Sequence, residues 1–298
     1  MGAIEAFTEA FSLLLRNKRL YLLTLIMALI MAPIAAYFVP NDLGNLPIFN
    51  GTYIQNNTSG VIIEEHGATV GDETALILEL LKGLAIYGLI AIVLSSIFEY
   101  AVTKGLMAES EEELPLGRLV LEGIKHFPGV IVVNVVYTLV VLVFIGIPFI
   151  PVAVGLMTLP AGAVLILLGL LLLIFTAAFA VGLSSLAIPA YVKNGSIGGA
   201  FEGFGLAFRN VLSSVGFGLL LGIGVFAISL VSSPIAFIVH YTVPEAMAPY
   251  VSALLQAPFE ALMSLFIWAG GVAFYRELKK KEELEKIDEE LAELGIEI

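Results

Sequence analysis

The feature that most constrains this chain is a run of 67 residues, 126–192, that contains no Asp, Glu, Lys or Arg. About 20 apolar residues at a rise of 1.5 Å each cross a hydrocarbon core of roughly 30 Å. The run therefore predicts two crossings, which we expect to be joined at Pro148, Pro151 and Pro160. With the other apolar stretches, six spans are predicted, at about 20–39, 80–103, 129–148, 161–190, 211–239 and 251–275.

The composition also indicates a protein that lies in a bilayer. Of its 298 residues 59% are hydrophobic and 13% are charged, whereas a soluble domain carries roughly 25% charged residues. A net charge of −12 without a basic tract argues against nucleic-acid binding. The absence of Cys excludes disulfides and Cys-bound metals. The predicted fold class is therefore an all-α polytopic membrane protein.

The distribution of basic residues predicts the orientation of the spans. With six spans, both termini lie on the same side of the membrane. Thirteen of the 14 Lys and Arg residues fall in or beside four segments, which are 1–19, 104–127, 191–210 and 276–298. Only Lys82 lies on the opposite side, so the positive-inside rule predicts that these segments are cytoplasmic. We expect a multi-pass plasma-membrane protein whose first span is retained rather than cleaved as a signal peptide.

A short segment occurs twice, each time ahead of a pair of predicted spans. Residues 9–17 and 202–210 are identical at five of nine positions. In the first copy the apolar residues recur at three- and four-residue spacing, which predicts an amphipathic helix at the membrane interface. The residues that define this interfacial repeat are Glu9, Phe11, Arg16 and Asn17 in the first copy and Glu202, Phe204, Arg209 and Asn210 in the second.

A shorter version of the same pattern precedes the third span, with Leu119 and Phe127 opposite Arg118 and Glu122. The 1–275 membrane domain and the residues just after it then divide into three units of one interfacial helix plus two crossings, at 1–104, 113–193 and 197–280. The alternative is that any helix entering the bilayer from the cytoplasm shows this pattern without duplication.

These motifs also carry a resemblance to a family. Residues 9–17, the middle motif 119–128 and the closing motif 274–279 resemble uncharacterised six-helix integral membrane proteins of archaea and bacteria. Those proteins are related to the membrane domain found beside some glycerophosphodiester phosphodiesterases. The resemblance rests on hydropathy and short motifs over most of the chain, and it implies a membrane module without supplying catalytic residues.

The two polar segments carry their own predictions. In the outer loop, 40–79, Asn50 and Gly51 stand between β-forming residues, which predicts a small extracytoplasmic β-hairpin at 48–54. The tail, 276–298, is charged and carries a helical stripe of Leu and Ile. We expect this cytoplasmic helical tail to be solvated or to dock on the protein itself, on a partner or on a second copy.

Polar groups within the spans are the candidate site residues, because an ionisable group at the bilayer centre costs about 2.5–3.5 kcal/mol. Glu260 is the deepest predicted carboxyl and follows Gln256 by one helical turn. Glu99 is expected at the same membrane level as Asn134. The alternative for Glu260 is a structural hydrogen bond to another helix. At the outer end of the second span, Glu79 and Lys82 are predicted to form an ion pair.

No motif for a metal hydrolase, a nucleotide-binding loop or a serine hydrolase occurs in the chain, so no catalytic, cofactor or metal residue is assigned. The favoured hypothesis is a helix bundle that binds or transports a lipid or other small amphiphile in an apolar cavity. Its polar contacts are expected to be Glu260, Gln256, Glu99 and Asn134. The alternative is a scaffold that contacts membrane lipids through its interfacial helices and recruits a partner through its tail. Two Gln, no Cys and a tail rich in Lys and Glu are typical of a thermophile, and we expect an archaeal source.

Overall fold

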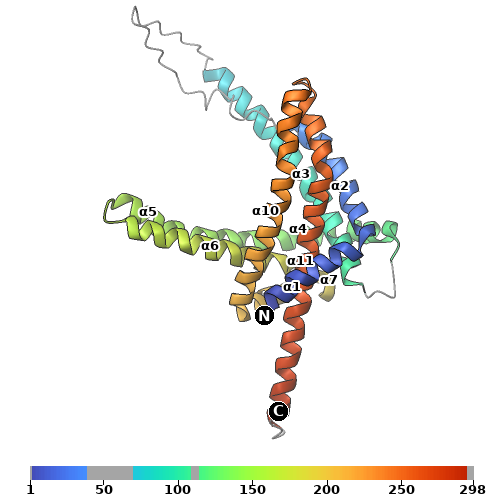
Figure 1. Ribbon diagram of the computed structural model, residues 1–298, viewed down its shortest axis with the longest axis vertical. Coiled ribbons are helices and arrows are strands. Elements are labelled where there is room, and N and C mark those ends of the chain that lie inside the picture. Colours follow the sequence, from blue (N-terminus) through green and yellow to red (C-terminus); the bar gives the residue numbers. More distant parts are fainter. Residues whose placement is uncertain (1, 39–69, 109–113, 294–298) are drawn as a thin grey trace, which may run out of the picture.

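The computed structural model describes residues 2–38, 70–108 and 114–293, and within these ranges it contains helices and no strand (Figure 1). The predicted hairpin at 48–54 lies outside the described residues. The helices are α1 (Gly2–Arg16), α2 (Lys18–Phe38), α3 (Val70–Met107), α4 (Leu116–Gly146), α5 (Phe149–Met157), α6 (Ala163–Ser185), α7 (Ala187–Asn194), α8 (Ile197–Ala200), α9 (Glu202–Arg209), α10 (Val211–Thr242) and α11 (Ala248–Glu293).

Within the described ranges, six helical stretches are long and apolar enough to cross a membrane, in agreement with the six predicted spans. They are Lys18–Phe38, Leu80–Met107, Leu116–Met157, Ala163–Asn194, Val211–Thr242 and Ala248–Leu291. The described part of the chain is therefore all-helical and has the character of a multi-pass membrane protein.

The turn of the second hairpin lies later in the chain than predicted. Pro148 precedes α5 and Pro151 lies within its first turn, where a missing N–H costs no intrahelical hydrogen bond. These two prolines therefore continue the helical path, and the prediction that they join the two crossings is wrong. The chain reverses at 158–162, and only Pro160 of the three belongs to that turn.

The middle interfacial helix does not exist as a separate element. α4 runs without a break from Leu116 to Gly146, through Pro128. Proline is tolerated inside spanning helices because neighbouring groups satisfy the backbone atoms that it frees. In the same way, α11 continues from the last span to Glu293, so the described part of the tail is an extension of a spanning helix.

The long helices form three pairs, and α11, a member of one pair, also contacts helices outside its own pair. α2 lies beside α3, α5 beside α6, and α10 beside α11, while α11 also packs against α1, α2 and α3. The α5–α6 pair points away from the upper ends of α10 and α11 (Figure 1). The middle of α11 lies in the hydrophobic core. There the Phe274 ring stacks on the Phe217 ring of α10, with centroids 4.3 Å apart. Both rings are fully buried.

Glycines let α6 and α10 cross in direct backbone contact. A Cβ atom added at Gly218 would collide with the carbonyl oxygen of Ala178, and one at Gly182 with the carbonyl oxygen of Ser214. On α11, a Cβ at Gly271 would collide with the carbonyl oxygen of Ser185. In a bilayer, the lipid tails are as apolar as the side chains of the bundle, so burying apolar side chains gives little stabilisation. Helices associate instead through close packing, which small residues at the crossings allow.

We expect Gly182→Ala and Gly218→Ala each to lower the free energy of unfolding by about 1–3 kcal/mol, the usual cost of overpacking a tight contact. The measurement is thermal unfolding in detergent followed by the emission of the single tryptophan. Gly222→Ala is the matched control, because a Cβ there meets nothing within 4 Å. Equal stability of all three variants would show that the crossing tolerates a methyl group.

Candidate functional site

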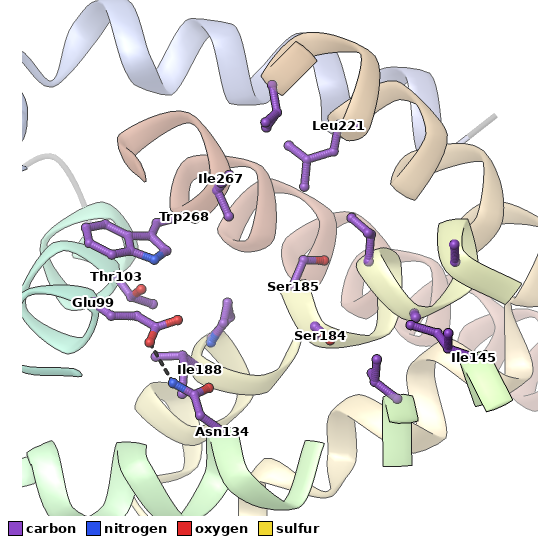
Figure 2. A pocket seen from close by; sticks show the side chains of 17 residues that line it. Glu99, Thr103, Asn134, Ile145, Ser184, Ser185, Ile188, Leu221, Ile267 and Trp268 are labelled. Carbon is purple, nitrogen blue, oxygen red and sulfur yellow. Dashed lines mark hydrogen bonds between the residues drawn. The ribbon is translucent and has the colours of Figure 1, made fainter. Parts of the chain in front are cut away.

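A cavity of about 510 Å³ lies among α3, α4, α6, α7, α10 and α11 (Figure 2). Apolar and small side chains make most of its wall, and the polar groups are few. The lining residues are Glu99, Thr103, Asn134, Val141, Ile145, Ala177, Ala180, Val181, Ser184, Ser185, Ile188, Pro189, Leu221, Gly222, Val225, Ile267 and Trp268. All three helix pairs contribute to the wall, so the cavity depends on how the pairs pack together.

The polar side chains of the wall other than Ser184 and Ser185 lie at one end, which we call the polar end of the cavity and define by Glu99, Thr103, Asn134 and Trp268 (Figure 2). The amide Nδ2 of Asn134 donates to the carboxyl Oε2 of Glu99 at 2.8 Å. Both side chains are half-buried. The structure thus brings together Glu99 of α3 and Asn134 of α4, the two residues that the sequence was expected to place at one level.

No cation among the described residues pairs with Glu99. The ion pairs of that part of the chain join Lys and Arg side chains to other acids, which are Glu9, Glu122, Glu202, Glu282 and Glu285. Among the described residues, Glu99 is also the only charged one that lines the cavity. Its single hydrogen bond, from Asn134, leaves the second carboxyl oxygen, Oε1, open to a ligand.

Glu260 and Gln256 do not belong to this site, so the four predicted polar contacts do not form one cluster. Glu260 is exposed and is absent from the cavity wall. It precedes Trp268 by eight residues on α11, which is about 12 Å at 1.5 Å per residue. Gln256 donates to Ser252 on its own helix at 2.7 Å. At the intervening proline, the Tyr21 hydroxyl donates to the carbonyl oxygen of Pro258 at 3.2 Å.

Sequence reasoning missed Trp268 and Thr103. A hydroxyl or an indole inside an apolar span costs little, and therefore gives no signal comparable to that of a carboxylate. The only hint was that the chain contains a single Trp, and its place on the cavity wall depends on the rotation of α11. Within the described residues, no group of three His, Asp or Glu side chains is placed to hold a metal ion.

The two copies of the interfacial repeat end in the same way. The side-chain Nδ2 of Asn17 donates to the carbonyl of Leu13 at 2.8 Å, and that of Asn210 donates to the carbonyl of Leu206 at 3.1 Å. Each Asn stands between a short helix and a spanning helix. Each carbonyl also accepts the backbone N–H of the same Asn, so the side chain adds a second hydrogen bond at the end of the short helix.

The two equivalent acids bind cations one turn apart on α11. Glu9 pairs with Arg276 at 3.4 Å and Glu202 pairs with Lys279 at 2.7 Å. Arg276 also donates to the carbonyl oxygen of Leu106 at 2.8 Å, which adds a contact to α3. Both copies of the repeat thus fasten the same stretch of α11.

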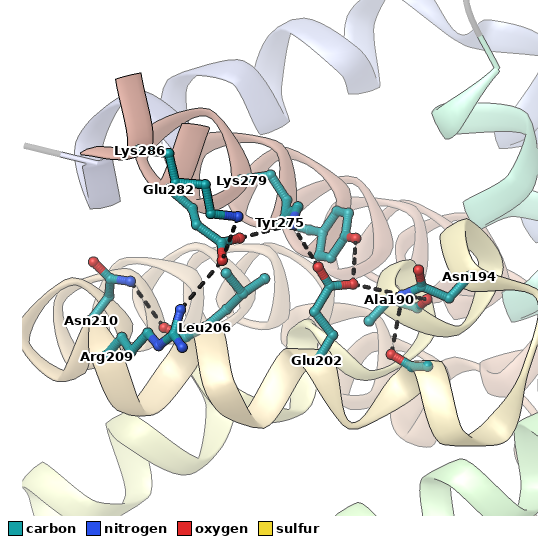
Figure 3. Close-up of polar contacts among 11 residues, drawn as sticks. Ala190, Asn194, Glu202, Leu206, Arg209, Asn210, Tyr275, Lys279, Glu282 and Lys286 are labelled. Atoms are coloured by element: carbon teal, nitrogen blue, oxygen red, sulfur yellow. Dashed lines mark hydrogen bonds and ion pairs between the residues drawn. The ribbon is translucent and has the colours of Figure 1, made fainter. Parts of the chain in front are cut away.

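The second copy forms a denser network, which we call the α9–α11 cluster and define by Asn194, Glu202, Tyr275, Lys279 and Glu282 (Figure 3). Asn194 and the Tyr275 hydroxyl donate to Glu202 at 2.6 and 3.1 Å. Lys279 bridges Glu202 and Glu282. Burial raises the pKa of Glu202, but the hydrogen bonds from Lys279, Asn194 and Tyr275 outweigh it, so the net pKa lies below its usual range.

The remaining predicted residues serve packing or face outward. The Phe11 ring contacts Phe266 with centroids 5.0 Å apart, and the Phe204 ring stacks on Tyr137 at 4.2 Å. Arg209 pairs with Glu282 at 3.3 Å. Two further cations, Arg16 and Lys82, are exposed. The side chain of Glu79 lies outside the described part, so its pair with Lys82 stays a prediction.

Comparison of the chain with models of protein families, with curated proteins and with solved structures finds no match. The resemblance to six-helix proteins related to the phosphodiesterase membrane domain therefore stays a prediction. The features of the structure that bear on function are therefore the cavity and the α9–α11 cluster.

We expect Glu202→Gln to lower the free energy of unfolding at neutral pH by about 1.5 kcal/mol, a typical value for hydrogen bonds to a charged group. Because the pKa of Glu202 is lowered by folding, its stabilisation is present above the ordinary carboxyl pKa and is lost as the pH falls through the lowered value. Thermal unfolding of the wild type and the variant should therefore converge in acid.

The matched control is Glu285→Gln, which removes an exposed acid paired only with Lys281 at 3.6 Å on the same helix. Such a pair contributes about 0–0.5 kcal/mol, so its removal should leave the pH profile unchanged. A gap between wild type and Glu202→Gln that persists at low pH would contradict the role given to this carboxylate.

Proposed function

We propose that the protein binds or transports a lipid or other small amphiphile in the cavity among its three helix pairs. The observation that carries the proposal is the one-sided polarity of a cavity of about 510 Å³. Ligand sites in proteins have volumes of about 300–1,000 Å³ and combine apolar walls with a few fixed polar groups. A charged group at one end, with a wall elsewhere that is apolar apart from Ser184 and Ser185, suits a molecule with one head and one hydrocarbon chain.

We also propose that the end of the bundle with α1, α9 and the C-terminal part of α11 lies in the cytoplasm. The support is the distribution of charge, since 13 of the 14 basic residues belong to the segments predicted to be cytoplasmic. In this orientation the α9–α11 cluster contacts water and lipid head groups. The polar end of the cavity then lies toward the inner leaflet.

The proposal further includes an origin of the first and third units by duplication. It is supported by the matched hydrogen bonds of Asn17 and Asn210 and by the matched ion pairs of Glu9 and Glu202. The uninterrupted α4 means that the middle unit lacks a separate interfacial helix. If the three units share an origin, the middle unit has diverged most from the other two.

Filling the cavity tests the proposed function. A side chain at Gly222 enters the cavity without meeting another atom within 4 Å of its Cβ. We expect Gly222→Leu to remove most of a discrete amphiphile adduct from native mass spectra of the gently extracted protein. Gly88→Leu is the matched control, because Gly88 lies on α3 away from the cavity and its Cβ also has open space. An adduct that survives Gly222→Leu would place the binding site elsewhere.

A second function, a scaffold that self-associates or recruits a partner, is favoured by one observation on the tail. Leu284 and Ile287 lie on one side of α11 and are 51% and 50% exposed. For this function, replacing both residues with Ser should lower the mass of the solubilised particle in light scattering without changing the amphiphile adduct. Deletion from residue 277 is a poorer test, because it also removes Lys279 and Glu282 from the α9–α11 cluster.

A further inference from the structure

We infer that the ligand of the cavity is a cationic amphiphile, a single-chain molecule whose head group is a protonated amine with N–H donors. This inference rests on the proposed function and specifies its substrate class. Three independent properties of the cavity support it: the sign of its charge, the type of its open hydrogen-bonding atoms and the aromatic ring beside them.

The charge of the wall selects against anionic head groups. None of the 17 lining residues is Lys, Arg or His, and the single charged residue among them is Glu99. A phosphate, sulfate or carboxylate head would enter a poorly solvated space with no counter-charge and would face a carboxyl group. A protonated amine instead supplies the cation that Glu99 lacks among the described residues.

The open atoms at the polar end include two acceptors that lie beside the charge of Glu99. Asn134 uses its Nδ2 to donate to Oε2 of Glu99. The Thr103 hydroxyl and the Trp268 indole N–H can donate, and no hydrogen bond joins either of them to another described residue. Two acceptors likewise remain without a partner among the described residues, the Oε1 of Glu99 and the carbonyl Oδ1 of Asn134. Both accept hydrogen bonds and neither donates when Glu99 is ionised. An ammonium head group with two or three N–H bonds matches this pair, whereas a head group made only of acceptors does not.

The indole of Trp268 completes the polar end, and Figure 2 shows it on the same side of the cavity as Glu99 and Thr103. Trp is the aromatic side chain that attracts cations most strongly, because of the negative potential over its ring face. A carboxylate, a carboxamide oxygen and an indole at one end of an apolar cavity are the groups from which ammonium sites are built. The hydrocarbon chain would then lie along Val141, Ile145 and Val181.

The single tryptophan provides a direct test, since Trp268 reports on the cavity alone. The full chain in maltoside micelles at neutral pH is titrated with three probes of equal chain length: dodecylamine, dodecanol and dodecanoate. We expect saturable changes of Trp268 emission, with a Kd for dodecylamine about tenfold or more below that of dodecanol, because a hydrogen-bonded charge contributes at least that factor. Dodecanoate should bind most weakly.

Variants then assign the preference to its residue. In Glu99→Gln the preference of dodecylamine over dodecanol should fall to about threefold or less, which corresponds to the loss of most of the charged contribution. Glu260→Gln is the matched control, because it removes an acid of α11 that lies outside the cavity, and its preference should equal that of the wild type. A preference that survives Glu99→Gln, or that disappears in Glu260→Gln, would overturn the inference.

A ligand series keeps the inference testable if Glu99→Gln does not fold. N-dodecylacetamide retains one N–H donor and the chain but has no charge, so we expect it to bind the wild type about as weakly as dodecanol. Equal binding of all probes would overturn the cationic preference and leave the proposed function standing. If no probe changes Trp268 emission saturably, the proposed function itself fails, and the inference fails with it.

Discussion

Direct backbone contact at three glycines is the constraint on which the rest of the structure depends. Bilayer lipids offer no hydrophobic gain for bringing spanning helices together, so close packing has to hold them. Gly182 and Gly218 let α6 and α10 touch, and Gly271 brings α11 against the end of α6. One turn beyond Gly218, Leu221 and Gly222 already line the cavity. The cavity is thus the space that opens where these helices cease to touch.

The carboxylates of Glu202 and Glu99 differ in the number of hydrogen bonds that they accept. Glu202 accepts hydrogen bonds from Asn194, Tyr275 and Lys279, as expected for a group that holds helices together. Glu99 accepts one, from Asn134, although it lies deeper in a span. A purely structural acid in an apolar setting gains most from full pairing. The incomplete pairing of Glu99 beside open space is the property expected of a ligand contact.

The sequence was sufficient to predict elements that depend on average hydropathy, and it failed where the outcome depends on how helices rotate against each other. The six spans follow from length and charge. Counting residues from the basic ends suggested a common level for Glu99 and Asn134, whereas their hydrogen bond is seen only in the structure. Whether Pro128 or Pro148 interrupts a helix depends on neighbours that satisfy the backbone, which a local pattern does not contain. The separation of Glu260 from the cavity depends on the position of α11 relative to α3 and α4.

The short helix α7 connects the cluster to the cavity. Ile188 and Pro189 belong to the cavity wall, and six residues after Ile188 the side chain of Asn194 donates to Glu202. α7 ends at Gly195, whose φ of 66° lies in the left-handed region that a glycine adopts without strain. Through Asn194, the α9–α11 cluster holds the far end of this short helix. Glu202 therefore contacts the same helix that places Ile188 and Pro189 in the cavity wall.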